Sequence, residues 1–350
     1  MSHPVSATWT PDVLGDEFEQ LTLPLGSDDE GEVVATLVRA LPRRTAWQRL
    51  FGDSRQLADT DVLYVHGWSD YFFQKRLARF WTGRGARFFA LDLRKYGRSL
   101  REYQTPGYIG DLVEYDQDIA AALAAMQEGS GAVGRRLVLL GHSTGGLILS
   151  LWAARNPGVA SAVILNSPWL EFQLSRFTRE TITPLVGLRA KYRPLDRAPQ
   201  VDLGYYTRAQ QEAADPADPM DVNLSWRPAQ TMAVHAGWLH AILGGHAAIA
   251  AGIAIDVPVC VLLSARSAVP TAWSDDLTRA DSVLVVEDIA RAALRIGPSV
   301  TIERIDGALH DVFLSRHEAR EEAYARLGHW VDGWAAADSA ARTQVMSPAH

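Results

Sequence analysis

The sequence contains a single cysteine, Cys260, among its 350 residues. One thiol cannot form a disulfide within the chain, so the cysteine content does not indicate an oxidising compartment. It also excludes a metal site built from several thiolates. An excess of positive charge is missing too, because 34 lysines and arginines stand against 41 aspartates and glutamates, a net charge of −7. Binding to phosphate backbones needs clustered positive charge, so we expect no nucleic acid partner.

Long hydrophobic runs are also missing from the sequence. The most apolar stretch is 241–255, which is shorter than the roughly 20 residues of a membrane-spanning helix and is interrupted by glycines and His246. We expect a buried helix there and no membrane span. Residues 1–12 carry no basic start followed by an apolar run, so no secretory signal is visible. These absences predict a cytoplasmic protein and leave its oligomeric state open.

The residues that are present have an ordinary globular composition, with 47% hydrophobic and 21% charged side chains. Short aliphatic runs alternate with helix-like segments from residue 60 to 166 and again from 257 to 334. The predicted strands are 61–66, 86–93, 136–141, 159–166, 257–264 and 299–305. The predicted helices are 72–81, 112–126, 145–155, 287–295 and 318–334. Near-continuous apolar strands separated by helices are typical of a parallel sheet covered on both faces.

The alternation is interrupted by residues 168–245, which are rich in proline, aromatic residues and arginine. We interpret this segment as an inserted, mainly helical cap on a core made of 1–167 and 246–350. Residues 13–41 are expected to add two antiparallel edge strands, which gives a mostly parallel sheet of eight strands. The end of the chain, 335–350, is expected to be a flexible tail.

The strongest chemical signal is the segment Gly141–Gly145 (GHSTG), which lies between a predicted strand and a predicted helix. A turn this tight requires small residues two positions before and two positions after the serine, and it holds the serine in strained backbone. The hydroxyl of Ser143 then stands above the sheet edge at a helix N-terminus, where backbone amides stabilise negative charge. This context predicts that Ser143 is a nucleophile.

A second turn, His66-Gly67-Trp68, closes the strand that should neighbour the serine turn. In this architecture one oxyanion-hole amide follows the serine, and the other comes from the end of this earlier strand. The backbone N–H groups of Thr144 and Trp68 are therefore predicted to form an oxyanion hole.

The base in such a site is a histidine that follows both the serine and an acid along the chain. His310 fits this order, because it lies between the last predicted strand and the last predicted helix. His317 is the rival, but it lies next to or within that helix. The acid should follow the strand at 257–264. Asp281 is the first choice, because the 29 residues before His310 hold one helix and one strand, and Asp276 is the alternative.

At this point the sequence resembles the α/β-hydrolase superfamily, and within it the monoacylglycerol lipase and lysophospholipase-like group, also described as serine aminopeptidase-like. The segments that carry the resemblance are 66–68 (HGW), 92–99 (DLRKYGRS), 141–146 (GHSTGG), 280–283 (ADSV) and 307–311 (GALHD). The resemblance implies an α/β-hydrolase fold and a triad of Ser143, His310 and Asp281, with no metal or organic cofactor. The chain departs from the family pattern in two places. Asp281 follows the strand end by about 17 residues, where the family has only a few, and the stretch 264–267 (SARS) lacks the family's usual glycine.

The resemblance implies two-step acyl transfer through an acyl-enzyme. We expect a serine hydrolase that cleaves a small-molecule carboxylic ester, of monoacylglycerol or lysophospholipid type, or a lactone. An aminopeptidase or amidase with the same triad is one alternative, and a non-catalytic binding protein on the same fold is another. The aromatic residues of the cap either line an apolar pocket or fill the cap's own core.

Overall fold

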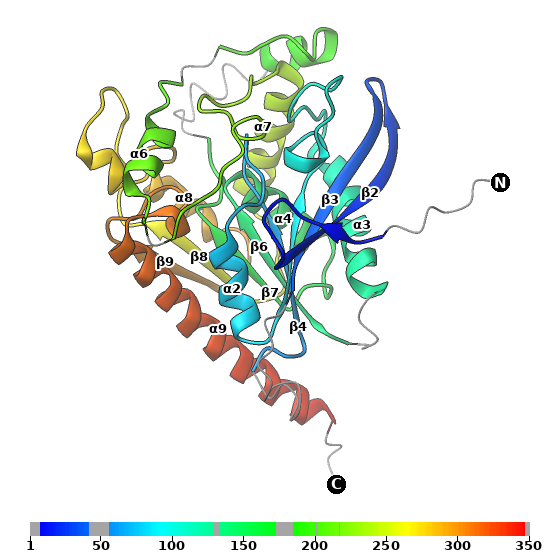
Figure 1. Ribbon diagram of the computed structural model, residues 1–350, viewed down its shortest axis with the longest axis vertical. Helices are drawn as coiled ribbons and strands as arrows, with labels where there is room; N and C mark the ends of the chain where they lie inside the picture. Colours follow the sequence, from blue (N-terminus) through cyan, green and yellow to red (C-terminus); the bar gives the residue numbers. More distant parts are fainter. Residues whose placement is uncertain are drawn as a thin grey trace, which may run out of the picture.

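The computed structural model describes residues 8–41, 56–128, 134–172, 185–199, 202–216 and 218–346 (Figure 1). The strands in this part of the chain are β1 (Thr10–Pro11), β2 (Phe18–Asp28), β3 (Gly31–Ala40), β4 (Thr60–Val65), β5 (Arg87–Asp92), β6 (Arg136–His142), β7 (Ala162–Asn166), β8 (Val259–Ser264) and β9 (Val300–Ile305). They form one sheet in the order β1-β2-β3-β5-β4-β6-β7-β8-β9. The pairs from β1 to β5 are antiparallel and those from β5 to β9 are parallel. The expected mostly parallel sheet is confirmed, and the two-residue β1 raises the number of strands from eight to nine.

Helices cover both faces of this sheet. The α-helices with assigned bounds are α2 (Lys75–Gly83), α3 (Tyr115–Glu128), α4 (Thr144–Arg155), α6 (Tyr205–Ala213), α7 (Ala236–Ala251), α8 (Val286–Ala293) and α9 (His317–Met346). The short 3-10 helices are η1 (Gly97–Ser99), η2 (Leu112–Glu114), η3 (Asp275–Thr278) and η4 (Val312–Leu314). Apart from the last helix, the ends of the expected core elements lie within three residues of the observed ones.

The parallel strands β4 to β8 are buried on both sides, because alternate side chains enter two separate hydrophobic cores, whereas the edge strand β9 is only partly buried. In β4, Leu63 and Val65 belong to the core that also contains side chains of α3, α4, α7 and α8, whereas Val62 and Tyr64 belong to the core that contains side chains of α2 and α9. This two-sided burial explains why the strands appear in the sequence as continuous apolar runs. The parallel pairing of β4, β6, β7 and β8 places their carboxyl ends along one edge of the sheet, where the chain turns into loops.

The segment between β7 and β8 contains the expected cap, of which residues 173–184 lie outside the described residues. It includes a helical stretch at 185–192, then α6 and α7, and it gathers at the end of the molecule opposite the C-terminus (Figure 1, green to yellow-green). The expected boundary at 245 falls inside α7, which runs on to Ala251. Trp238, Ile242 and Ile249 of this helix join the same core as α4, so α7 ties the cap to the body of the protein.

The expected flexible tail is wrong over residues 335–346, because α9 continues to Met346. Trp334 and Ala335 are buried against the sheet, and the Trp334 indole N–H donates to the carbonyl oxygen of Ser161 at 3.1 Å. Packing on the core therefore extends the helix beyond the expected end. Residues 347–350 lie outside the described residues. Within the ranges that the structure describes, none of the helices combines the length and apolar character needed to cross a bilayer.

Candidate active site

The turn between β6 and α4 holds Ser143 in the conformation that the sequence predicts. Its backbone has φ 51° and ψ −117°, in a region that residues other than glycine rarely adopt. The glycines around it are sterically required: a Cβ on Gly145 would lie 2.3 Å from the carbonyl oxygen of His66, and a Cβ on Gly141 would lie 2.7 Å from that of Gly145. The tight contact between this turn and the end of β4 therefore fixes where the serine stands.

The predicted oxyanion donors lie on the two chain segments that meet at this contact. A Cβ on Gly67 would lie 3.0 Å from the Cβ of Ser143, so the turn after β4 touches the serine. Thr144 is the first residue of α4, and its amide has no carbonyl partner within the helix. The Trp68 amide donates to no backbone carbonyl among the described residues. Two amides beside the serine are thus left for a ligand oxygen.

His310 and Asp281 form a buried pair. The Nδ1 atom of His310 lies 2.9 Å from Oδ2 of Asp281, and both side chains are almost fully shielded from solvent. The other carboxylate oxygen, Oδ1, accepts the N–H groups of Val283 and Leu284 at 2.8 and 2.7 Å. Because a carboxylate can only accept, the proton of a neutral His310 belongs on Nδ1. The lone pair is then on Nε2, which is buried and has no hydrogen-bond partner among the described residues.

The loop before Asp281 explains the unusual spacing between the acid and its strand. Ser267 and Asp281 form an isolated parallel bridge, in which the Asp281 N–H donates to Arg266 O at 3.0 Å and the Ala268 N–H donates to Asp281 O at 2.8 Å. The chain therefore leaves the end of β8, makes an excursion through η3, and returns to the point that it left. Asp281 is therefore paired with Ser267, a residue only three positions after the end of β8 at Ser264.

The two rival residues lie on the surface. The side chain of Asp276 is 54% exposed and forms an ion pair with Arg266, with 2.8 Å between Oδ2 and Nη1. His317 is 63% exposed and contacts Asp215, with 3.2 Å between Nδ1 and Oδ2. Asp281, and not Asp276, is bonded to His310, and His310 is buried whereas His317 is exposed, so the geometry favours Asp281 and His310.

Sequence reasoning missed a second buried carboxylate, Asp311, next to His310. Its oxygens accept the side-chain amides of Gln74 at 2.6 Å and Asn166 at 2.7 Å. Oδ2 also lies 3.9 Å from Nε2 of His142, and burial lowers the pKa of that histidine, so His142 is neutral near pH 7. Asp311 belongs to the GALHD segment, but its partners carry no recognisable local motif. The network joins the ends of β6 and β7 to the loop that bears His310.

Three tryptophans pack together near the serine turn. The backbone N–H of Trp169 donates to the carbonyl oxygen of Ser143 at 2.9 Å, and the ring centroids of Trp68 and Trp238 lie 3.9 Å apart. Trp169 lies 6.0 Å from Trp238 by the same measure. Trp238 is buried, whereas Trp68 and Trp169 are partly exposed. The two cap tryptophans thus differ, because Trp238 is buried in the core and Trp169 is partly exposed.

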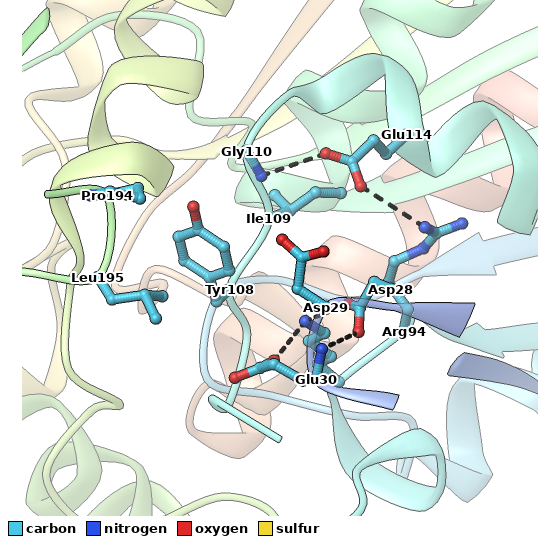
Figure 2. A pocket seen from close by; sticks show the side chains of 11 residues that line it. Asp28, Asp29, Glu30, Arg94, Tyr108, Ile109, Gly110, Glu114, Pro194 and Leu195 are labelled. Carbon is cyan, nitrogen blue, oxygen red and sulfur yellow. Dashed lines mark hydrogen bonds and ion pairs between the residues drawn. The ribbon is translucent and has the colours of Figure 1, made fainter. Parts of the chain in front are cut away.

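A separate pocket of about 310 Å³ opens between the β2–β3 hairpin and the cap, away from Ser143 and His310. Figure 2 shows Tyr108 facing Pro194 and Leu195 across it. Lys95 bonds the carboxylates of Asp28 at 2.6 Å and Glu30 at 2.5 Å. Burial alone would raise the pKa of these two acids, but the Lys95 ammonium lowers it below the usual range. The charges in this pocket largely satisfy one another, and no catalytic arrangement lines it.

Among the described residues, no group of three or more histidine, cysteine, aspartate or glutamate side chains is arranged to hold a metal ion. Polar contacts join His310 to Asp281, and Asp311 to Asn166 and His142. The Ser143 N–H donates to the carbonyl oxygen of Asn166 at 3.0 Å, and the ring of His142, next to Ser143, lies 5.0 Å from that of His310. A serine in a strained turn, together with a histidine that is paired with a buried acid, is suited to activating a hydroxyl as a nucleophile.

Comparisons with known proteins bear on the family and the fold. The family described as "Serine aminopeptidase, S33" matches residues 57–316, most of the chain. The fold is similar to that of a soluble variant of monoglyceride lipase from Saccharomyces cerevisiae, with 16% identity, a TM-score of 0.59, and coverage of 89% of this chain and 96% of that one. It is also similar to the monoacylglycerol lipase of Paleococcus ferrophilus, with 18% identity, a TM-score of 0.58, and coverage of 78% and 94%.

A thermophilic esterase from Thermogutta terrifontis is a further similar structure, at 15% identity and a TM-score of 0.52, with coverage of 89% of this chain and 98% of that one. A comparison with curated proteins finds no significant match. Likenesses at this level of identity establish the fold, whereas the family match extends over the whole region from β4 to the loop after His310. The chain is therefore an α/β-hydrolase and belongs to the serine aminopeptidase S33 family.

Proposed function

We propose that this protein is a serine hydrolase that cleaves carboxylic esters, with Ser143 as nucleophile, His310 as general base and Asp281 as its partner. The observation that carries the proposal is the buried 2.9 Å contact between His310 and Asp281, which leaves the Nε2 of His310 unpartnered. The strained turn at Ser143 supports the same assignment, and so does the membership of the chain in an α/β-hydrolase family.

In the proposed reaction, Nε2 of His310 takes the proton of Ser143 as its Oγ attacks the ester carbonyl carbon. The Trp68 and Thr144 amides donate to the oxyanion of the tetrahedral intermediate. Asp281 keeps the Nδ1–H tautomer and stabilises the imidazolium that forms. His310 then gives its proton to the leaving alcohol, and an acyl-enzyme remains on Ser143. A water molecule, deprotonated by His310, releases the acid and restores the serine.

The surroundings of Ser143 favour a substrate with an apolar group. Trp68 and Trp169 are partly exposed residues of the two segments that contact the serine turn, and aromatic surfaces bind apolar groups by burying area. The S33 family description raises a second candidate, cleavage of an amide or of a peptide N-terminus with the same triad. Recognition of a free peptide N-terminus needs a pocket carboxylate for the substrate amine, and two buried acids of the described residues, Asp281 and Asp311, are already bonded within the protein.

The direct test is hydrolysis of p-nitrophenyl esters of increasing acyl length by wild-type protein and by Ser143→Ala. We expect p-nitrophenol release that is lost in the variant, and an optimum in chain length that reflects the indole surface. A parallel series of amino-acyl p-nitroanilides tests the second candidate. Turnover of anilides but not of esters would replace the ester proposal with the amide one, and equal ester turnover by Ser143→Ala would contradict both.

A further inference from the structure

The residues that follow Trp68 are bonded one after another to a single segment of the cap, 223–232. The Met232 N–H donates to Oγ of Ser69 at 3.1 Å, and Nε of Arg227 donates to Oδ1 of Asp70 at 2.8 Å. The Asn223 N–H donates to the hydroxyl of Tyr71 at 2.7 Å. The loop that carries one proposed oxyanion donor is thus held by the cap at three consecutive positions.

The contact between Arg227 and Asp70 differs from the surface ion pairs of this protein, because both side chains are largely removed from solvent. Asp70 is 6% exposed and Arg227 is 13% exposed. Nη2 of Arg227 also donates to Oε1 of Gln210 on α6 at 2.7 Å, so the guanidinium joins two parts of the cap to the core. Burial alone would lower the pKa of Arg227, but the charge of Asp70 raises it and keeps the side chain charged. Removing one partner would leave the other charge buried and unpaired.

The backbone next to Trp68 has reason to depend on these contacts. Ser69 has φ 54°, a left-handed conformation that a residue with a Cβ adopts only at an energetic cost. Such a conformation persists where the surrounding structure fixes it, and here the cap supplies bonds on Ser69 and on the two residues after it. The Trp68 amide lies one residue before this strained position, in the same loop that the cap contacts hold.

We propose that Arg227 is a positioning residue that sets the oxyanion hole from the cap. By holding Asp70, the guanidinium fixes the loop at 67–71 so that the Trp68 amide points at the developing oxyanion beside Ser143. This inference rests on the proposed function and adds to it, because it makes the catalytic power of the core depend on a cap residue that does not touch the reacting atoms.

The test compares Arg227→Met, Asp70→Asn and the double variant with wild type on the best p-nitrophenyl ester. Removing an oxyanion donor lowers kcat by about 10²- to 10³-fold in other hydrolases, so a misdirected donor should cost about ten- to a hundredfold in kcat. KM should change by no more than about threefold, because the oxyanion forms only in the transition state. The double variant should be no slower than the slower single variant, since both act through one contact.

A trifluoromethyl ketone, which forms a tetrahedral adduct with a reactive serine, gives a readout that a general loss of packing would not reproduce. In Arg227→Met the inhibition constant of this ketone should rise by about the same factor as kcat falls. Arg227→Lys keeps the charge, should fold even where the methionine variant does not, and should show an intermediate loss. Arg189→Met removes an exposed cap ion pair with Asp196 and serves as the matched control, with kcat unchanged.

Each outcome bears on one assignment. Thermal unfolding first establishes that Arg227→Met and Asp70→Asn are folded. If both folded variants keep the wild-type kcat, the positioning role is overturned and the proposed function stands. A rise in KM at constant kcat would also overturn it, because Arg227 would then act in ground-state binding. Absence of ester turnover in wild-type protein would overturn the proposed function and the inference with it.

Discussion

The turn around Ser143 and the loop around Asp281 deliver two residues of one proposed triad, yet they are fixed in opposite ways. The serine turn is determined within a few residues, because Gly141 and Gly145 allow backbone approaches that any side chain would block. The acid loop is determined by contacts between distant residues, with Asp281 paired to Ser267 after an excursion through η3. Local sterics leave a motif in the sequence, whereas a returning loop does not.

Between the serine turn and the acid loop, the largest loss of kcat is expected when the nucleophile of the turn is removed. Ser143→Ala should lower kcat for ester hydrolysis by on the order of 10⁶-fold, because no other group of the triad can form the acyl-enzyme. Steady-state kinetics with active-site titration measures the loss, and urea unfolding should show stability close to that of wild type. A variant that keeps more than about one per cent of the wild-type kcat would place the nucleophile elsewhere.

The acid loop should give the next largest effect. Asp281→Asn should lower kcat by on the order of 10⁴-fold, because an amide partner favours the wrong histidine tautomer. Asp276→Asn is the matched control from the same loop and should leave kcat within about twofold, since Asp276 contacts only Arg266 on the surface. If the two results were exchanged, Asp276 would be the acid and the returning path of the loop would not matter for catalysis.

Steric control of the serine turn should appear as lost stability. Gly145→Ala forces a Cβ to within 2.3 Å of the His66 carbonyl oxygen, so we expect the free energy of unfolding to fall by about 3 kcal/mol. Gly244→Ala in α7 is the matched control, because a Cβ there meets no atom within 4 Å and helix propensity favours alanine by up to about 1 kcal/mol. Equal stabilities of the two variants in urea unfolding would show that the turn tolerates a side chain.

The smallest effect concerns His142, inside the serine turn. Burial lowers its pKa in the folded protein below the ordinary 6.5, so the unfolded chain binds the proton at a higher pH than the folded chain does. The stability that this group supports is therefore present above about pH 6.5 and is lost as the pH falls below it.

Urea unfolding of wild type and His142→Asn at pH 7.5 and pH 5.5 checks this dependence. The variant should lose less stability between the two values than wild type does. An identical loss in both proteins would mean that other groups account for the acid sensitivity of the turn.

The sequence indicates those parts of the molecule that depend on local chemistry. The strands from β4 to β8 follow from apolar runs, and the Ser143 turn follows from its glycines. The helix at 335–346 was missed although alanines dominate it, because the burial of Trp334 and Ala335 that supports it is a tertiary contact. The path of the acid loop could not be predicted either, since Ser267 and Asp281 meet only after a loop whose shape no local pattern sets.

Buried polar networks were the least accessible to sequence reasoning. Asp311 is joined to Gln74, a residue 237 positions earlier, and Arg227 is joined to Asp70, which is 157 positions earlier. Neither pair has a spacing that sequence periodicity could reveal, because each depends on how the sheet edge and the cap meet. These contacts are also where single substitutions should separate catalysis from folding.

The most direct test of the central claim is mass spectrometry of protein quenched during turnover of a p-nitrophenyl ester. The account predicts a mass increase equal to the acyl group, located by peptide mapping on Ser143 and absent in Ser143→Ala. It also predicts that the adduct accumulates in Asp281→Asn if deacylation becomes slower than acylation. Turnover with no acyl group on Ser143, or with the acyl group on another residue, would contradict the proposed mechanism.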